Sequence, residues 1–325
     1  MTSRAWISAT GVDTAPGRRA GGWRWLCLAA LLCGVLAVFG DDYQLRFAAE
    51  ILLVGTAVMS LNVLVGFAGL VSLGHGAVFG AAAYGAAIAS QHWGSDLLLM
   101  LPVGVLCGMA LAALMALVSY RSSGLFFLVL TLVVGQMAWE VVFRWREVTG
   151  GADGLRGYPA LTVAGLPASH PLALFALALA LAIASGWALR TFVRAPVGHA
   201  VQGMRDQPLR MRALGFHLGR LRLQTFLVTG AVAGAAGSIY PFVNQYIGPN
   251  AVHWSMSATL VIMSVLGGIA TLAGGFAGAA LYLVAQTQLS SWTDRWQLLI
   301  GMLFVLTVIF VPHGIVPALR RRFTS

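Results

Sequence analysis

The residues of this chain best suited to chemistry within apolar surroundings are two carboxylates, Glu50 and Glu140, which lie in long apolar stretches. A carboxylate at the centre of a helix in hydrocarbon costs about 2.5–3.5 kcal/mol, so each should lie near a helix end or face a cavity. Each has an arginine four residues away, Arg46 before Glu50 and Arg144 after Glu140. Because that spacing places both side chains on one helix face, we predict two structural ion pairs near the outer interface.

The sequence offers no arrangement suited to catalysis or metal binding. No apolar stretch holds a paired His, Asp or Glu cluster at ligand spacing, and Cys27, Cys33 and Cys107 read as small apolar residues. All 20 basic residues are arginines, so a phosphate-binding loop that ends in Gly-Lys-Ser or Gly-Lys-Thr cannot form. We therefore expect a chain without catalytic residues, metal or cofactor, and any ATP it depends on must be hydrolysed by another chain.

The composition indicates that lipid, rather than water, surrounds the elements that carry these residues. Hydrophobic residues make up 59% of the 325 residues, charged residues only 9%, and the mean hydropathy is +0.84. A soluble domain carries about 25% charged residues. We predict an all-α integral membrane protein, a polytopic bundle of about ten transmembrane helices within one domain spanning 1–325. The predicted spans are 24–39, 47–66, 76–91, 97–119, 123–142, 171–193, 222–242, 258–273, 274–290 and 296–311.

The arginines predict which side each connection faces. With ten spans and a cytoplasmic N-terminus, 15 of the 20 arginines fall on the cytoplasmic side, whereas most acids fall outside. Positive residues favour the cytoplasmic side, so both termini are predicted to be cytoplasmic. The cytoplasmic segments are a tail at 1–23, a polar helical segment at 194–222 and a tail at 317–325.

Glycines spaced four apart predict close helix packing. The pairs are Gly76/Gly80, Gly104/Gly108, Gly230/Gly234 and Gly274/Gly278, and small residues let helix backbones approach within a membrane. The Gly-rich regions 66–80 and 266–280 allow two interpretations, tight cytoplasmic turns or broken re-entrant segments buried in protein. They look loosely alike, which hints at an internal repeat.

Several motifs occur in order along residues 47–316. Residues 62–84 read NVLVGFAGLVSLGHGAVFGAAAY, followed by GLFFLVLTL at 124–132 and TGGADGL at 149–155. The segment Gly198–Gly215 follows, then PNAVHW at 249–254, VLGGIATLAGG at 265–275 and PHG at 312–314. Together these motifs closely resemble the LivH/LivM type of branched-chain amino acid ABC transporter permeases, and the LivM branch in particular.

The resemblance implies a fold like that of the ribose-type sugar permeases. It also implies a second, LivH-like permease subunit, two cytoplasmic ATP-binding subunits and a periplasmic substrate-binding protein, in a bacterial inner membrane. Urea and short-amide importers share the family, so the substrate class stays open. An ion-coupled secondary transporter is the less favoured alternative, because it would need several charged residues within the spans. A membrane-embedded enzyme is disfavoured by the missing ligand clusters.

The resemblance implies that Gly198–Gly215 is the family's cytoplasmic coupling segment, whereas the path and gate candidates follow from the residues themselves. The segment 194–222 is too polar to enter lipid, Pro208 suits the first turn of a short helix, and Gly215 suits a helix stop. We predict that this segment couples to the ATPase. The candidate coupling residues are Gly198, Arg205, Asp206, Arg212, Ala213, Leu214 and Gly215. The candidate path residues are Asn62, Gln136, Tyr240 and Asn244, and the candidate gate residues are Ser72, Gly74 and His75.

Overall fold

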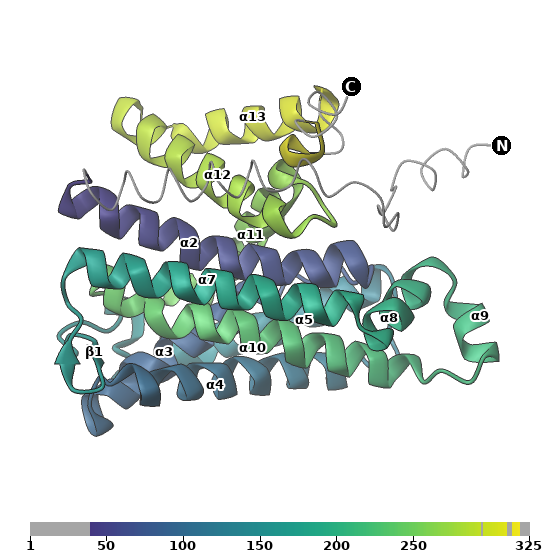
Figure 1. Ribbon diagram of the computed structural model, residues 1–325, viewed down its shortest axis with the longest axis horizontal. Coiled ribbons are helices and arrows are strands. Elements are labelled where there is room, and N and C mark those ends of the chain that lie inside the picture. Colours follow the sequence, from purple (N-terminus) through teal and green to yellow (C-terminus); the bar gives the residue numbers. More distant parts are fainter. Residues whose placement is uncertain (1–39, 294, 311–313, 319–325) are drawn as a thin grey trace.

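The computed structural model describes residues 40–293, 295–310 and 314–318, and nearly all of its regular structure is helical (Figure 1). The long helices are α2 (Asp42–Asn62) with its π-helical continuation η1 (Val63–Phe67), α3 (His75–Trp93), α4 (Leu97–Val118), α5 (Leu125–Arg144), α7 (Pro171–Arg194), α10 (Leu218–Asn244), α11 (Trp254–Gly267), α12 (Leu272–Trp292) and α13 (Trp296–Phe310). The short elements are α6 (Arg146–Thr149), η2 (Gly151–Asp153), β1 (Thr162–Val163), β2 (Leu166–Pro167), α8 (Pro196–Asp206), α9 (Pro208–Ala213) and η3 (Pro249–Ala251). The two strands form a small antiparallel hairpin.

Five described helices are long and apolar enough to cross a membrane, namely α2 with η1, α4, α5, α7 and α10. Helices α11 and α12 pass the same test together, but the chain bends by 112° between them. The predicted boundary at 273/274 therefore falls at 268–271 instead. The predicted span 24–39 lies outside the described residues, and the count of ten spans stays a prediction.

Helix starts and stops follow local chemistry. Asp96 precedes α4, and its carboxylate accepts a hydrogen bond from the N–H of Leu98 (3.0 Å), which satisfies one of the free donors of the first turn. Pro171 and Pro196 occupy the first positions of α7 and α8, where a missing N–H costs nothing. These signals place the ends of α4 and α7 within one residue of the predicted spans.

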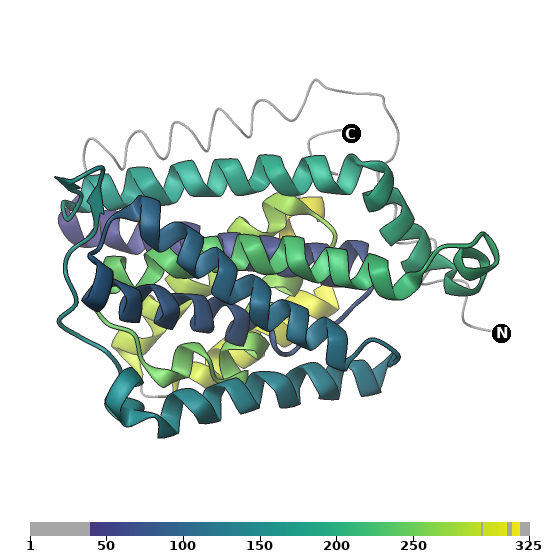
Figure 2. The same cartoon turned by 90° about the horizontal axis from the view of Figure 1, so that it is seen from below.

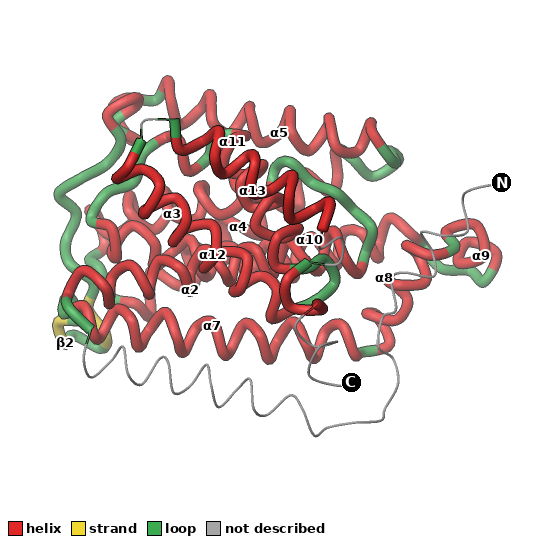
Figure 3. The backbone as a smooth tube through the Cα atoms, turned by 90° about the horizontal axis from the view of Figure 1, so that it is seen from above, coloured by secondary structure: helices red, strands yellow, loops and turns green. Residues whose placement is uncertain are grey.

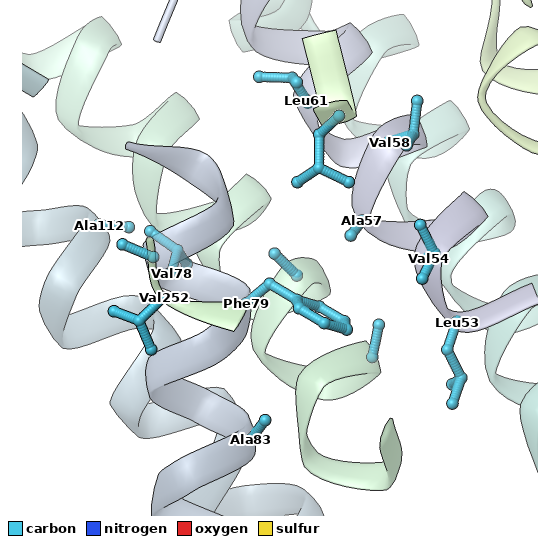
Figure 4. Close-up of a cluster of buried hydrophobic side chains, with 14 of the residues drawn as sticks. Leu53, Val54, Ala57, Val58, Leu61, Val78, Phe79, Ala83, Ala112 and Val252 are labelled. Atoms are coloured by element: carbon cyan, nitrogen blue, oxygen red, sulfur yellow. The ribbon is translucent and has the colours of Figure 1, made fainter. Parts of the chain in front are cut away.

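A seam of glycines joins α4 to the buried helix α10. A Cβ added to Gly108 would lie 2.6 Å from the carbonyl oxygen of Gly230 and 2.8 Å from the Cα of Gly234. The backbones are therefore in direct contact, as the four-residue spacing predicted. Beside the seam, fully buried Phe79 of α3 faces apolar side chains of α2 (Figure 4).

The helices run side by side, with α7 and α5 on opposite flanks (Figures 2 and 3). Helices α8 and α9 project beyond one end of the bundle, which we call the hairpin end (Figure 1). The arginines at the hairpin end are Arg121, Arg190, Arg194, Arg205, Arg210, Arg212, Arg220 and Arg222, whereas Asp41, Asp42, Asp96, Glu147 and Asp153 belong to the opposite end. Most described arginines thus lie at the hairpin end, whereas the opposite end carries both signs, including Arg46, Arg144, Arg146 and Arg156.

Candidate functional site

The segment predicted to be polar and helical forms a helical hairpin, α8–α9. Gly198 lies in the first turn of α8, where an added Cβ would collide with the carbonyl oxygens of Phe192 and Val193. Pro208 starts α9, and Gly215 ends it with φ +86°. The N–H of Gly215 donates to the carbonyl of Arg212 and that of Phe216 to the carbonyl of Met211, both at 3.0 Å. This pair of bonds is a Schellman stop, so the roles predicted for Pro208 and Gly215 are confirmed.

The tip of the hairpin carries exposed apolar side chains. Leu209 is 78% exposed, Leu214 66% and Phe216 44%, and Ala213 and Arg212 are also exposed. The sequence singled out Ala213 and Leu214 but missed Leu209 and Phe216. The sequence feature that could have identified Leu209 and Phe216 is an apolar residue near each end of an arginine-rich helix, in a segment too polar to enter lipid. These apolar side chains lie on a polar projection at the arginine-rich end of the bundle.

Arg205 points back toward the bundle. Its Nε donates to the carboxylate of Asp206 (2.9 Å), and its Nη1 donates to the backbone carbonyl of Gly66. The arginine side chain is only 20% exposed, whereas Asp206 is mostly exposed. Arg205 therefore pairs with Asp206 and also ties α8 to the end of α2.

Asn62 is a path candidate whose amide is fully engaged by the protein. Its Nδ2 donates to the carbonyl of Thr271 (3.1 Å), and its Oδ1 accepts a hydrogen bond from the hydroxyl of Ser264. The side chain is completely buried. Asn62 thus clamps the turn between α11 and α12 to the end of α2.

The gate candidates lie where the chain passes from η1 back to α3. Buried His75, the first residue of α3, contacts the hydroxyl of Ser60 through Nε2 (2.7 Å). Ser72 is also buried and accepts a hydrogen bond from the N–H of Gly74 (3.3 Å). The N–H of Leu73 donates to the hydroxyl of Thr131 on α5 (3.3 Å). Polar side chains therefore satisfy this irregular backbone inside the protein, as a low-dielectric setting requires.

The other path candidates lie apart from Asn62. Tyr240 donates its hydroxyl to Glu50 (3.3 Å) and meets the ring of Phe79 edge to face. Asn244 is exposed at the last residue of α10. On α5, Gln136 lines a cleft of about 340 Å³ with Leu132 and Trp254. The structure does not bring these four residues into one cluster.

The two intramembrane acids have different partners. Glu140 forms the predicted ion pair with Arg144. The predicted pair between Arg46 and Glu50 is wrong, because Arg46 donates instead to the carbonyl of Val243 (3.1 Å) while Glu50 accepts from Tyr240. Val243 lies in the last turn of α10, where carbonyls lack helical partners and attract cations.

The segment that follows α5 packs against the end of α10 that lies away from the α8–α9 hairpin. Leu155 and Ile247 exchange backbone hydrogen bonds of 2.8 and 3.1 Å. Tyr158 donates its hydroxyl to the carbonyl of Pro241 (2.6 Å), and burial raises the pKa of this tyrosine, so the hydroxyl remains a donor at neutral pH. The motif at 149–155 is therefore a structural joint. Among the described residues, no group of three His, Cys, Asp or Glu side chains could hold a metal ion.

A bundle of long apolar helices with an arginine-rich hairpin at one end defines a polytopic membrane protein. The sequence matches the family described as "Branched-chain amino acid transport system / permease component" over residues 43–308. Because the match spans most of the chain, the protein belongs to this family of membrane permeases.

The curated relatives place the similarity in the LivM branch. The chain is 26% identical over 285 residues to the High-affinity branched-chain amino acid transport system permease protein LivM of Escherichia coli (strain K12), covering 81% of this chain and 67% of the relative. The protein of the same name from Salmonella typhimurium is equally similar, at 26% identity over 285 residues. No solved structure matches the chain.

Proposed function

We propose that this chain is the permease subunit of a binding-protein-dependent ABC importer for branched-chain or related amino acids. The observation that carries the proposal is the family match, which runs from α2 to α13 and includes the α8–α9 hairpin. The names of the LivM relatives support the substrate class. The protein would act in a bacterial inner membrane with both termini in the cytoplasm, an orientation supported by the arginines at the hairpin end.

Energy would come from other chains. The sequence contains no lysine, and therefore cannot form the lysine-bearing phosphate loop of an ATPase. We infer two separate cytoplasmic ATP-binding subunits, a second LivH-like permease subunit and a periplasmic binding protein as partners. The substrate path would be mostly apolar, with Asn62, Gln136, Tyr240 and Asn244 as its few polar groups. Ser72, Gly74 and His75 would form a gate.

The hairpin is the proposed docking element for the ATPase. It projects from the arginine-rich end, and its tip exposes Leu214 beside Ala213, above the glycine stop at Gly215. An apolar side chain that fills a partner pocket commonly loses about 2 kcal/mol or more of binding on truncation. Arg205 and Asp206 would hold the hairpin against the bundle, and Gly198 would set its exit from α7.

Uptake by the complete importer tests the substrate class. The complex is reconstituted in vesicles with its ATPase and binding-protein partners, and labelled leucine, isoleucine, urea and short amides are compared with and without ATP. We expect ATP-dependent uptake of the branched-chain amino acids. Uptake of only urea or amides would contradict the proposed substrate class. Uptake driven by an ion gradient without ATP would contradict the proposed ABC importer function.

Leu214→Asp tests the docking role. A buried aspartate should weaken ATPase binding by about thirty-fold if the loss is about 2 kcal/mol. Co-purification of the ATPase and substrate-stimulated ATP hydrolysis should both fall, while membrane abundance stays normal because Leu214 is exposed. Leu166→Asp is the matched control, since Leu166 is similarly exposed in the strand hairpin at the opposite end. Wild-type binding by Leu214→Asp would show that the hairpin does not dock the ATPase.

A further inference from the structure

The end of α2 leaves the regular helical hydrogen-bond ladder at the hairpin end. Residues 63–67 form a π-helix, and the N–H groups of Ala68 and Leu70 reach back to the carbonyls of Val63 (3.0 Å) and Leu64 (2.8 Å). Carbonyls at the end of a helix need other partners. The carbonyl of Gly66 accepts a hydrogen bond from Nη1 of Arg205 in α8.

The stem of Arg205 is held as closely as its guanidinium. Gly69 has φ +68°, and a Cβ added there would lie 2.5 Å from Cγ of Arg205. Asp206 neutralises the guanidinium from the solvent side. A largely buried charge requires an ion-pair partner and hydrogen bonds. Asp206 and the Gly66 carbonyl supply these for Arg205, so the position of Arg205 relative to Gly66 is strongly specified.

The other side of Gly66 contacts the turn between α11 and α12. A Cβ added to Gly66 would lie 2.5 Å from the Cα of Ala270. Ala270 has φ +64°, a left-handed conformation that is strained for a non-glycine residue. Asn62 holds the same turn through Thr271 and the start of the bend through Ser264.

One short segment, 62–69, therefore contacts both the hairpin and the bent turn. Such strained conformations persist only where surrounding contacts hold them, and they concentrate in switch regions. Short π-helical stretches are also frequent at functional sites. A displacement of α8 that carries the Gly66 carbonyl with it must press on or release the backbone of Ala270, because no side chain separates them.

We propose that Arg205 is a positioning residue that links movement of the α8–α9 hairpin to the α11–α12 turn through the Gly66 carbonyl. This proposal rests on the proposed function, in which the hairpin docks the ATPase, and adds the route by which docking reaches the bundle. The link requires two contacts. One is the hydrogen bond from Arg205 to the Gly66 carbonyl, and the other is the Asn62 clamp on the α11–α12 turn.

The test uses the complete importer and three substitutions. Arg205→Met keeps an apolar stem against Gly69 and removes the donors, Arg205→Lys restores one cationic donor, and Arg220→Met is the matched control because Arg220 is exposed in the same segment. A single thiol introduced by Ala270→Cys, with Cys27, Cys33 and Cys107 replaced by alanine, reports the turn. The labelling rate of this reporter thiol is measured with and without ATP and vanadate, alongside ATPase co-purification, ATP hydrolysis and substrate carried per ATP.

We expect Arg205→Met to retain the ATPase, to lose the nucleotide-dependent change at the reporter thiol and to carry at least about fivefold less substrate per ATP, the lower scale of coupling between sites. Arg205→Lys should recover part of both readouts, and Arg220→Met should behave as the parent. Wild-type labelling and transport per ATP in Arg205→Met would overturn the link, as would loss of ATPase binding, which would place Arg205 in docking itself.

Two further outcomes keep the test decisive. If Arg205→Met does not accumulate, Asn62→Leu breaks the clamp on the far side of Gly66, and wild-type coupling in that variant would overturn the link. A parent complex that carries no amino acid, yet changes the labelling of its reporter thiol with ATP, would refute the proposed substrate and leave the link standing. A parent without nucleotide-dependent labelling would overturn the link directly.

Discussion

The seam between α4 and α10 and the junction between α2, α8 and the α11–α12 turn are built by opposite means. In the seam, glycines bring two backbones into contact without any side chain, as at Gly108 and Gly230. In the junction, a broken helix, polar side chains and an alanine at positive φ hold three elements together around Gly66. Both are tightly packed, but only the junction depends on hydrogen bonds between separate elements.

The difference indicates which region can move. Close-packed backbones transmit force as one body, because packed cores deform little. The junction is held by a few hydrogen bonds between separate elements, so a displacement of one element is passed to the others. The seam should therefore set stability, whereas the junction should set coupling. Three substitutions test this division between stability and coupling.

Gly108→Leu should have the largest effect on stability. Its side chain would collide with the carbonyl of Gly230 and the backbone of Gly234, and overpacking costs about 1–3 kcal/mol or more. We expect sharply reduced membrane abundance and a lower Tm in detergent. Gly301→Leu on α13 is the control, because a Cβ there meets no atom within 4 Å. Equal behaviour of the two variants would mean that close packing in the seam does not set the stability of the bundle.

Ser264→Ala should have an intermediate effect. It leaves Oδ1 of Asn62 buried without the Ser264 donor, and such a loss costs about 1–3 kcal/mol. We expect normal abundance, a Tm a few degrees lower and reduced transport per ATP. Ser290→Ala, which removes an exposed hydroxyl on α12, should change none of these. A fall in Tm with fully retained coupling would assign the Asn62 clamp to stability alone.

Glu140→Gln should have the smallest effect, because it breaks a polar contact outside both regions. Glu140 and Arg144 are partly exposed on α5, and an exposed ion pair contributes about 0.2–1 kcal/mol. Uptake should stay within a few-fold of wild type, as measured at equal membrane abundance. Complete loss of transport would show that Glu140 serves the path and not a structural pair.

Local sequence features determine much of the architecture of this protein. Apolar length, caps such as Asp96 and prolines such as Pro171 set the spans, since each depends on neighbours within a few residues. Glycines four apart predicted close packing of helix backbones, because that spacing places both glycines on one helix face. The α8–α9 hairpin was predictable for the same reason, with Pro208 starting a helix and Gly215 ending it. The division of arginine from acid likewise follows from the chain alone.

Only the tertiary structure decided which polar groups meet. Arg46 lies four residues from Glu50, yet it binds the carbonyl of Val243, because packing brings the end of α10 within hydrogen-bonding distance. Arg205 reaches Gly66 and Asn62 reaches Thr271 across 139 and 209 residues of chain. The chain bends by 112° between α11 and α12, and the contact from Asn62 to Thr271 lies at that bend. A sequence determines which donors and acceptors exist, whereas packing of distant helices decides which of them lie within hydrogen-bonding distance.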